Sequence, residues 1–385
     1  MEMTLRARAV AAIAGAAALS FAGAASAEVK LPDTLIWSAY DTGSSGHAQS
    51  VAIGKAFKEK YDVNLRVLPG ANDIARLTPL KVGKADAVSN GVGTYFAQEG
   101  VFEFAKPDWG PQPLRLIMSS KGKAGLMVGV AADTGVKEYK DLRGKRVAWV
   151  KSAPALNHNV TAILAFAGLT WDDVEKVEFA GFGASWEGMT NNQVDAAFAI
   201  TVSGSTNAVA SSPRGLVWPS LPFDDKGGWD RMMAVAPYFT KNVVSAGTNV
   251  PKEGIQGQAY PYPILTVRED MTTELAQAMT AGLLETYDMY KDGAPGAAGW
   301  ALENQTFEWA VPYHDGAIAA FKAAGVWTDA MQAHNDKLVG RQKVLIDAWA
   351  AFTKDAPSDE DAFVEAWGKA RIAALEAAGL DPVIR

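Results

Sequence analysis

One order of strand-like and helix-like runs occurs twice in the chain, and this repetition limits the folds that the chain can adopt. In the first unit, an apolar strand-like run at 35–40 is followed by a Gly/Ser loop and by helical spacing of apolar residues at 53–61. A strand with one polar face at 63–67, a helix at 73–82 and a third strand at 86–90 complete the unit. Strands that alternate with helices in this way form parallel sheets with right-handed crossovers, so the pattern predicts an α/β unit.

The second unit repeats this order further along the chain. Its strand, helix, strand, helix and strand are expected at 146–150, 157–167, 176–181, 185–190 and 195–200. The third strand of each unit follows a similar short sequence, with Asp86 and Asp195 at matching places. Because 385 residues exceed what one hydrophobic core usually organises, the repeat predicts two α/β domains.

The remainder of the chain has a different texture. Prolines punctuate 211–262, which predicts loops and short strands where the chain crosses back. Further helices are expected at 274–290, 316–324, 328–351 and 359–378. Amphipathic helices mostly bury a core face, so we interpret these as scaffold or as a covering layer.

The first 27 residues have the pattern of a secretory signal peptide. Arg6 and Arg8 precede an apolar run at 9–19, and the small residues Ala25-Ser26-Ala27 precede Glu28. A membrane-spanning helix needs about 20 apolar residues, so we expect export and cleavage after Ala27 rather than anchoring. No cysteine is present to carry a lipid anchor. The pattern predicts a soluble protein of the Gram-negative periplasm that is not itself inserted in the membrane.

Composition and motifs exclude several functions. The chain has 36 Lys and Arg against 43 Asp and Glu, a net charge of −7 that disfavours nucleic-acid binding. The absence of cysteine excludes disulfides, thiolate metal sites and cysteine nucleophiles. The four histidines lack metal-binding spacing, and no nucleophile elbow or phosphate-binding loop is present. An S-x-x-K match at 120–123 is interpreted as an exposed hairpin turn. We therefore expect no metal, no cofactor and no catalysis.

Small polar residues follow the predicted strands of both units, and the carboxyl ends of the strands in such sheets form a crevice that binds ligands. Several of these segments lead into helices, whose N-termini present free N–H groups and a partial positive charge suited to a carboxylate. The candidate ligand-binding residues at these strand ends are Gly43, Ser44, Ser45, Asn72, Asp73, Asn90, Asn157, Gly183, Ser185 and Thr201. N-caps and turns use the same residue types, so that alternative stays open for each of them.

Aromatic residues near the same strand ends could wall the apolar part of a ligand. The candidates are Trp37, Tyr95, Phe182 and Trp186. For Trp37 and Phe182, burial between sheet and helices is an equally good interpretation. Arg76 could reach a carboxylate with two hydrogen bonds, or it could be a surface residue paired with solvent or Asp73.

Five segments in order along the chain carry a family resemblance. They are GSSG at 43–46, PGANDIARL at 69–77, GKADA at 83–87, DLRGKRV at 141–147 and VPYHDGA at 311–317. Together they resemble the TAXI family of solute receptors, the extracytoplasmic binding proteins of one class of TRAP transporters. The ligand-contacting loop G-A-P-G-S-G-T of that family is replaced by SAPALNH at 152–158. The resemblance therefore adds Ala153 and His158 to the candidate residues and implies a differently shaped site.

The resemblance implies a periplasmic-binding-protein type II fold, in which two α/β lobes surround a hinged cleft. Lobe one is expected at 28–126 plus 246–385, including the C-terminal helices, and lobe two at 127–245. The implied function is capture of a small carboxylated solute, an organic anion or amino acid, and delivery to TRAP membrane permease subunits. Two alternatives stay open: an enzyme on the same scaffold with His158 or His47 as general base, and a sensor without a permease.

Overall fold

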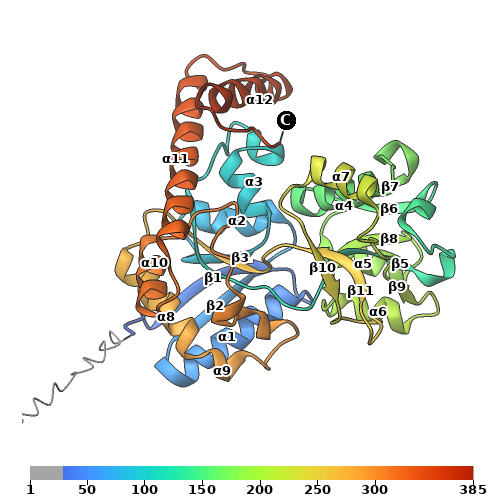
Figure 1. Ribbon diagram of the computed structural model, residues 1–385, viewed down its shortest axis with the longest axis horizontal. Coiled ribbons are helices and arrows are strands. Elements are labelled where there is room, and N and C mark those ends of the chain that lie inside the picture. Colours follow the sequence, from blue (N-terminus) through green and yellow to red (C-terminus); the bar gives the residue numbers. More distant parts are fainter. Residues whose placement is uncertain (1–28, 385) are drawn as a thin grey trace, which may run out of the picture.

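The computed structural model describes residues 29–384 and contains two five-stranded sheets, which lie side by side in Figure 1. The predicted signal peptide at 1–27 lies outside the described residues. No helix among the described residues is both long and apolar enough to cross a bilayer.

The first sheet and its helices form the first lobe. Its strands are β1 (Thr34–Tyr40), β2 (Asn64–Gly70), β3 (Ala87–Asn90), β4 (Leu114–Ser119) and β12 (Ile264–Arg268). Its helices are α1 (Ser45–Tyr61), α2 (Asp73–Lys81), α3 (Gly93–Glu99), α8 (Thr273–Glu285), α9 (Tyr287–Tyr290) and α10 (Asp315–Ala323). Short 3-10 turns occur at Phe102–Ala105, Ala297–Trp300 and Leu302–Asn304.

The second sheet, with its helices and one ribbon, forms the second lobe. Its strands are β5 (Leu126–Ala131), β6 (Arg146–Val150), β7 (Glu175–Phe179), β8 (Ala196–Ile200) and β9 (Leu216–Val217). Its helices are α4 (Pro154–Phe166), α5 (Phe182–Thr190), α6 (Ser205–Ser211) and α7 (Lys226–Val235). The ribbon of β10 (Thr240–Val244) and β11 (Ile255–Ala259) lies beside the start of β5, where the Asn242 amide donates to the Ala124 carbonyl at 3.0 Å.

Both sheets have the same strand order once each is counted from the start of its own repeat. The first reads β2-β1-β3-β12-β4 and the second β7-β6-β8-β5-β9. The three repeat strands run parallel to one another, whereas β12 and β5 run antiparallel to them. These two antiparallel strands enter their sheets directly after the chain has passed from the other lobe. The predicted class, a periplasmic-binding-protein type II fold of two α/β lobes, is confirmed.

The matching aspartates of the two repeats have the same structural role. Asp86 accepts a hydrogen bond from the Ile36 amide at 2.7 Å and donates its own amide to the Ile36 carbonyl at 2.8 Å. Asp195 does the same with Arg146, at 3.1 and 2.8 Å. Each carboxylate therefore holds the first strand of its repeat against the start of the third. The repeated sequence marks a sheet joint and not a solute contact.

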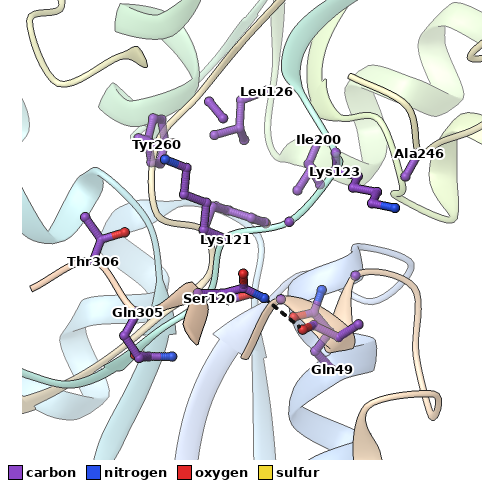
Figure 2. A pocket seen from close by; sticks show the side chains of 18 of the residues that line it. Gln49, Ser120, Lys121, Lys123, Leu126, Ile200, Ala246, Tyr260, Gln305 and Thr306 are labelled. Carbon is purple, nitrogen blue, oxygen red and sulfur yellow. Dashed lines mark hydrogen bonds between the residues drawn. The ribbon is translucent and has the colours of Figure 1, made fainter. Parts of the chain in front are cut away.

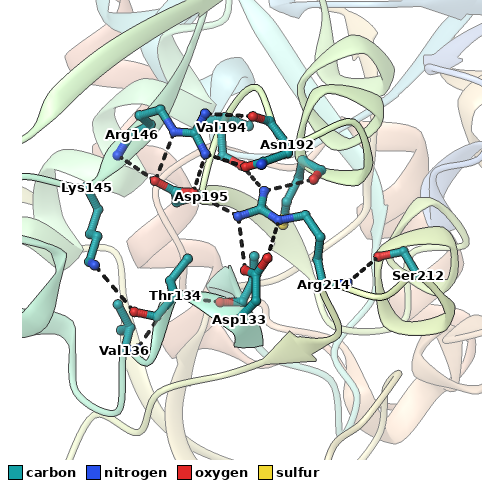
Figure 3. A network of polar contacts seen from close by, with 12 residues as sticks. Asp133, Thr134, Val136, Lys145, Arg146, Asn192, Val194, Asp195, Ser212 and Arg214 are labelled. Atoms are coloured by element: carbon teal, nitrogen blue, oxygen red, sulfur yellow. Dashed lines mark hydrogen bonds and ion pairs between the residues drawn. The ribbon is translucent and has the colours of Figure 1, made fainter.

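Asp195 is also the centre of a charged network at one edge of the second lobe (Figure 3). Arg146 and Arg214 both reach its carboxylate, and Arg214 also holds Asp133 at 2.9 Å. Partial burial acts to raise the pKa of Asp195, but the hydrogen bonds from the two arginines outweigh it and lower the pKa from 3.8 to about 2. The ionised form of Asp195 thus stabilises the folded lobe.

We expect Asp195→Asn to destabilise the protein by about 2 kcal/mol near pH 7. The folded-state pKa lies below the unfolded value, so this contribution is present above about pH 4 and is lost as the pH falls toward 2. Urea unfolding between pH 7 and pH 2 should show the stabilities of wild type and variant converging. The matched control is Asp172→Asn, at an exposed position. A gap between wild type and Asp195→Asn that stays constant with pH would contradict the assignment.

The chain passes between the lobes at two crossings, residues 120–125 and 260–263. The hairpin turn predicted at 120–123 is wrong, because β4 and β5 lie in different sheets and do not pair. The two crossings lie side by side: the Tyr262 amide donates to the Ser120 carbonyl at 2.6 Å, and the Ser120 amide donates to the Pro263 carbonyl at 2.8 Å. The return to lobe one predicted at 246 falls before β11, and the chain enters the first sheet at Ile264.

Two long helices, α11 (Asp329–Phe352) and α12 (Glu360–Ala377), form an arm that rises from the first lobe (Figure 1). A buried charge cluster fastens this arm to α3. The Glu99 carboxylate, 0% exposed, accepts two hydrogen bonds of 2.7 Å from Arg341 and also pairs with Arg371. The Trp367 indole donates to the Gly100 carbonyl at 2.6 Å. The C-terminal helices therefore share buried contacts with the first lobe.

Close packing of α10 against α8 depends on a glycine. A Cβ on Gly316 would stand 2.2 Å from the Thr273 carbonyl oxygen, a backbone atom that cannot move aside cheaply. We expect Gly316→Ala to destabilise the protein by about 1–3 kcal/mol, because the two helices must separate.

Gly340 supplies the matched control for Gly316→Ala. It lies in α11, and a Cβ added there would have no other atom within 4 Å, so Gly340→Ala should stabilise the protein by about 0.5–1 kcal/mol through helix propensity alone. Thermal or urea unfolding of both variants tests the pair. Equal effects of the two substitutions would show that the approach of α10 to α8 does not require glycine.

Candidate functional site

The strand ends of the two lobes touch one another directly. Three helices of the second lobe begin against acceptors of the first lobe. The Ala155 amide of α4 donates to Asp73 at 2.8 Å, and the Gly183 amide of α5 donates to Asp41 at 3.2 Å. The Ser205 amide of α6 donates to the Gly43 carbonyl at 3.1 Å. We call this set of contacts the tip contacts.

The tip contacts change the interpretation of the helix N-termini. A helix N-terminus favours a negative charge, and the sequence suggested that a carboxylate of the solute would use it. In the structure, Asp73 lies at the start of α4 and Asp41 at the start of α5. The protein's own carboxylates thus occupy two of the positions that a bound acid would take.

Behind the tip contacts lies a buried cluster around Arg76, which is 4% exposed. Its guanidinium forms an ion pair with Asp73 and donates to Asn90 at 3.1 Å and to the Gly70 carbonyl at 3.1 Å. The ring of Tyr40 lies 4.1 Å from the guanidinium carbon, in cation–π contact. Pairing with Asp73 was one predicted alternative, but the surface position predicted with it is wrong.

Burial governs the protonation of this cluster. It raises the pKa of Asp73, and the charge of Arg76 and the Ala155 amide oppose that rise. Burial also raises the pKa values of Tyr40, Tyr260 and Tyr262 above 10, so these phenols keep their protons. The cluster therefore offers hydroxyl donors and one guanidinium.

A small cavity of about 40 Å³ lies between the lobes at this cluster. First-lobe residues Tyr40, Ser44 and Arg76 line it together with second-lobe residues Ala155 and Phe182. The crossing residues Tyr260 and Tyr262 and the side chain of Asn159 complete its polar wall. Space of this size holds a few water molecules. A larger guest would need the lobes to separate.

A second and much larger cavity, of about 1010 Å³, lies at the two crossings. Figure 2 shows Lys121 and Lys123 on the first crossing, with Gln49 and Gln305 on the first-lobe side and Ile200 on the second-lobe side. Leu126, Ile200, Tyr260 and Tyr262 line both cavities. The two spaces therefore lie next to each other.

The structure brings some predicted site residues to the boundary between the lobes. Gly43, Asp73 and Gly183 take part in the tip contacts, Ser44 and Phe182 line the small cavity, and Asn90 binds Arg76.

Other predicted residues lie within their own lobe, and most of the polar ones bond there. Asn72 caps α2 through the Ala75 amide at 2.8 Å, and Asn157 bonds both the amide and the carbonyl of Val150. Ser185 donates to the Phe182 carbonyl at 2.7 Å, and Thr201 donates to the Ala246 carbonyl at 2.6 Å. Ser45 is buried in the first turn of α1, and Ala153 is the N-cap residue of α4.

Two of the four aromatic candidates, Trp37 and Trp186, pack inside their own lobes. Trp37 is 1% exposed and meets Phe57 edge to face, with ring centroids 6.1 Å apart. Trp186 donates its indole N–H to the Phe198 carbonyl at 3.1 Å within the second lobe. Tyr95 is buried at the boundary between the lobes, where its ring meets that of Tyr238 from the second lobe. For Trp37 the structure thus supports the core interpretation that the sequence left open.

The two histidines of the enzymatic alternative lie on different lobes. His158 on α4 has its Nε2 2.9 Å from the Val235 carbonyl, so that nitrogen must carry the proton. Burial lowers the pKa of His158, which keeps the ring neutral. His47 lies in the first turn of α1. Among residues 29–384, no group of three or more His, Cys, Asp or Glu side chains could hold a metal ion.

Sequence reasoning missed the tyrosines at the crossings. Tyr260 and Tyr262 come from a proline-rich stretch, YPYP at 260–263, that gave no strand or helix signal. Asn159 lies one turn inside α4 and donates to the Tyr260 hydroxyl at 3.2 Å. This contact could not be predicted from the sequence, because it depends on where the second crossing passes. Proline-flanked tyrosines between two α/β units were the one available signal.

The chain belongs to the NMT1-like family, whose sequence pattern matches residues 42–325. No curated protein matches it in sequence. Among solved structures, the aliphatic sulphonate binding protein SsuA from Escherichia coli is 16% identical, with a TM-score of 0.41 over 80% of this chain and 84% of that one. PhnD1 from Prochlorococcus marinus in complex with methylphosphonate is 12% identical, with a TM-score of 0.41 over 69% and 92%. These distant likenesses carry no information on the solute of this protein.

We expect Asp41→Ala to favour separation of the lobes. The substitution removes the acceptor of the Gly183 amide, whereas the Phe182 amide keeps its hydrogen bond to the Ala71 carbonyl at 3.1 Å. Loss of such a cap weakens the contact by about 1 kcal/mol, or about fivefold in population. Small-angle X-ray scattering should show a larger mean radius of gyration for the variant than for wild type. The exposed Asp292→Ala serves as control. An Asp41→Ala protein as compact as the control would show that this tip contact does not hold the lobes together.

Proposed function

We propose that the protein is a periplasmic solute-binding protein that captures a small carboxylated organic solute between its two lobes. One observation carries this proposal: a buried guanidinium, that of Arg76, lines a cavity whose walls come from both lobes and from the second crossing. A guest held there contacts both lobes at once. Such a guest favours the closed arrangement by its differential affinity for the closed and open forms.

Arg76 supports the choice of a carboxylate. Three hydrogen bonds within the protein use three of its five N–H groups, and the other two remain for a guest. Hydroxyl groups of Ser44, Tyr260 and Tyr262 lie around the same cavity and can donate as well. Because Asp73 already balances the charge of Arg76, the guest gains hydrogen bonds more than net charge, which favours a small acid over a polyanion.

The small cavity sets a requirement for binding. It has room for only a few water molecules, so a solute enters when the tip contacts are broken and the lobes have separated. Closure around the solute would then rebuild part of the tip contacts. The solute thus competes with the contacts that hold the empty protein closed.

The finer parts of the proposal extend the family resemblance. We infer export through the signal peptide at 1–27, membership of the TAXI class, and delivery of the solute to TRAP membrane permease subunits. The lobes expected from the sequence for this cycle are 28–126 plus 246–385 and 127–245. Because β11 pairs with β10, we propose that the ribbon moves with the second lobe and that the chain returns to lobe one at the second crossing, residues 260–263. The NMT1-like family match supports the coarser assignment.

Calorimetry with a panel of small carboxylates tests the proposal on the mature chain. At least one acid should bind saturably to wild type, and the double variant Asp73→Asn/Arg76→Gln should bind it at least about tenfold more weakly, because it lacks the guanidinium. Changing both partners leaves no uncompensated buried charge, so the variant should stay folded. Asn90→Ala, which frees one N–H of Arg76, should also alter the affinity. Unchanged affinity in both variants would place the solute elsewhere.

The enzymatic alternative predicts a different result. If His158 or His47 acts as a general base, the acid that binds should disappear on incubation and the loss should cease in the corresponding alanine variant. For a binding protein, mass spectrometry should recover the same molecule unchanged from the protein. Turnover that depends on either histidine would overturn the assignment.

A further inference from the structure

The large cavity at the crossings carries four charged side chains. Lys121 and Lys123 come from the first crossing, and Glu303 and Glu308 come from the segment after the turn at Ala297–Trp300. All four residues are exposed. No ion pair joins any of them to another residue within 29–384, so the lysines do not neutralise the glutamates.

The rest of the wall is neutral and mixed. Gln49, Ser120, Asn304, Gln305 and Thr306 provide polar groups, and Leu126, Ile200 and Phe307 provide apolar surface. The volume of about 1010 Å³ lies at the upper end of ordinary ligand sites, which run from about 300 to 1,000 Å³. This cavity can therefore hold an organic molecule without any movement of the lobes, which the small cavity cannot.

We propose that this cavity is a second ligand site, which binds an elongated zwitterionic organic molecule with the chemistry of a short peptide. Its carboxylate pairs with Lys121 or Lys123, whose side chains extend to opposite sides of the crossing (Figure 2), and its ammonium group pairs with Glu303 or Glu308. A purely anionic guest would satisfy the lysines and meet repulsion from the glutamates, and a purely cationic guest would do the reverse. A molecule with both charges at its ends matches both.

The two lysines stand at the point where the chain changes lobes. The Lys121 amide donates to the Gly299 carbonyl of the first lobe at 3.1 Å. The Lys123 carbonyl accepts the Ser245 and Ala246 amides of the second lobe at 2.9 and 3.2 Å. Gly122 between them is exposed. The two lysines are therefore each anchored through the backbone to a different lobe.

Three probes of nearly equal size test the charge pattern on the mature full chain. Tetraglycine is a zwitterion at neutral pH, its N-acetyl form is an anion, and its C-terminal amide is a cation. Extended, each spans up to about 14 Å. By calorimetry, we expect tetraglycine to bind, and each blocked form to bind about tenfold more weakly, because it loses one charged pairing. Equal binding of all three, or no binding of tetraglycine, would overturn the proposal.

Paired variants assign the two charges to their residues. Lys121→Ala/Lys123→Ala should weaken tetraglycine and its N-acetyl form about tenfold and leave the amide form unchanged. Glu303→Gln/Glu308→Gln should weaken tetraglycine and the amide form and leave the N-acetyl form unchanged. A general loss of structure would weaken all three probes alike. A variant pair that weakens the wrong blocked form contradicts the proposal.

Control variants separate this site from general surface charge and from the cavity at Arg76. Lys60→Ala and Glu59→Gln, on the exposed end of α1, should leave all three affinities unchanged. Asp73→Asn/Arg76→Gln should also leave tetraglycine binding unchanged, even if it abolishes binding of a small carboxylate. If tetraglycine does not bind, the proposed carboxylate site at Arg76 is unaffected. If no small carboxylate binds at Arg76, the proposal for the large cavity is likewise unaffected. Loss of tetraglycine binding in Asp73→Asn/Arg76→Gln would mean that the two cavities form one site.

Discussion

Hydrogen bonds from the helix N-termini of one lobe to acceptors of the other are the interaction on which the arrangement of this protein depends. They bring α4, α5 and α6 against Asp73, Asp41 and the Gly43 carbonyl. By doing so they enclose the Arg76 cluster and reduce the space beside it to about 40 Å³. The same contacts leave the cavity at the crossings open, because the crossings themselves hold its walls apart. In the closed arrangement, the boundary between the lobes thus contains a small cavity at Arg76 and a large cavity at the crossings.

Much of the fold could be predicted because it depends on local patterns. The strand at 146–150 is found with the predicted bounds, as β6. The helix predicted from 157 begins three residues earlier, since Pro154 suits the first turn of a helix and gives no apolar period. The helix predicted at 274–290 is divided into α8 and α9 at Thr286. The hairpin at 120–123 was a failure of another kind, because only the assignment of β4 and β5 to separate sheets shows that they cannot pair.

The site was harder to predict than the fold because it depends on contacts between segments that are far apart in the sequence. Strand-end residues such as Gly43 and Asp73 could be expected to lie at the boundary, since parallel strands end at one edge of a sheet. Which acceptor faces which helix could not, because it depends on how two separately folded lobes meet. Asp73 was expected to contact a solute and Asp41 gave no such signal, yet both accept amides of the other lobe. Tyr260 and Tyr262 reach the site only because the second crossing passes between the lobes there.

The buried cluster at Glu99 has a consequence for how such a protein can change over evolutionary time. The NMT1-like match ends at residue 325, whereas both arginines that neutralise Glu99 come from beyond it. If both arginines were replaced while the C-terminal helices stayed in place, the enclosed Glu99 carboxylate would lose its cationic partners, at a cost of several kcal/mol. A change at Glu99 therefore requires a compensating change at Arg341 and Arg371, outside the part of the chain that the family pattern covers.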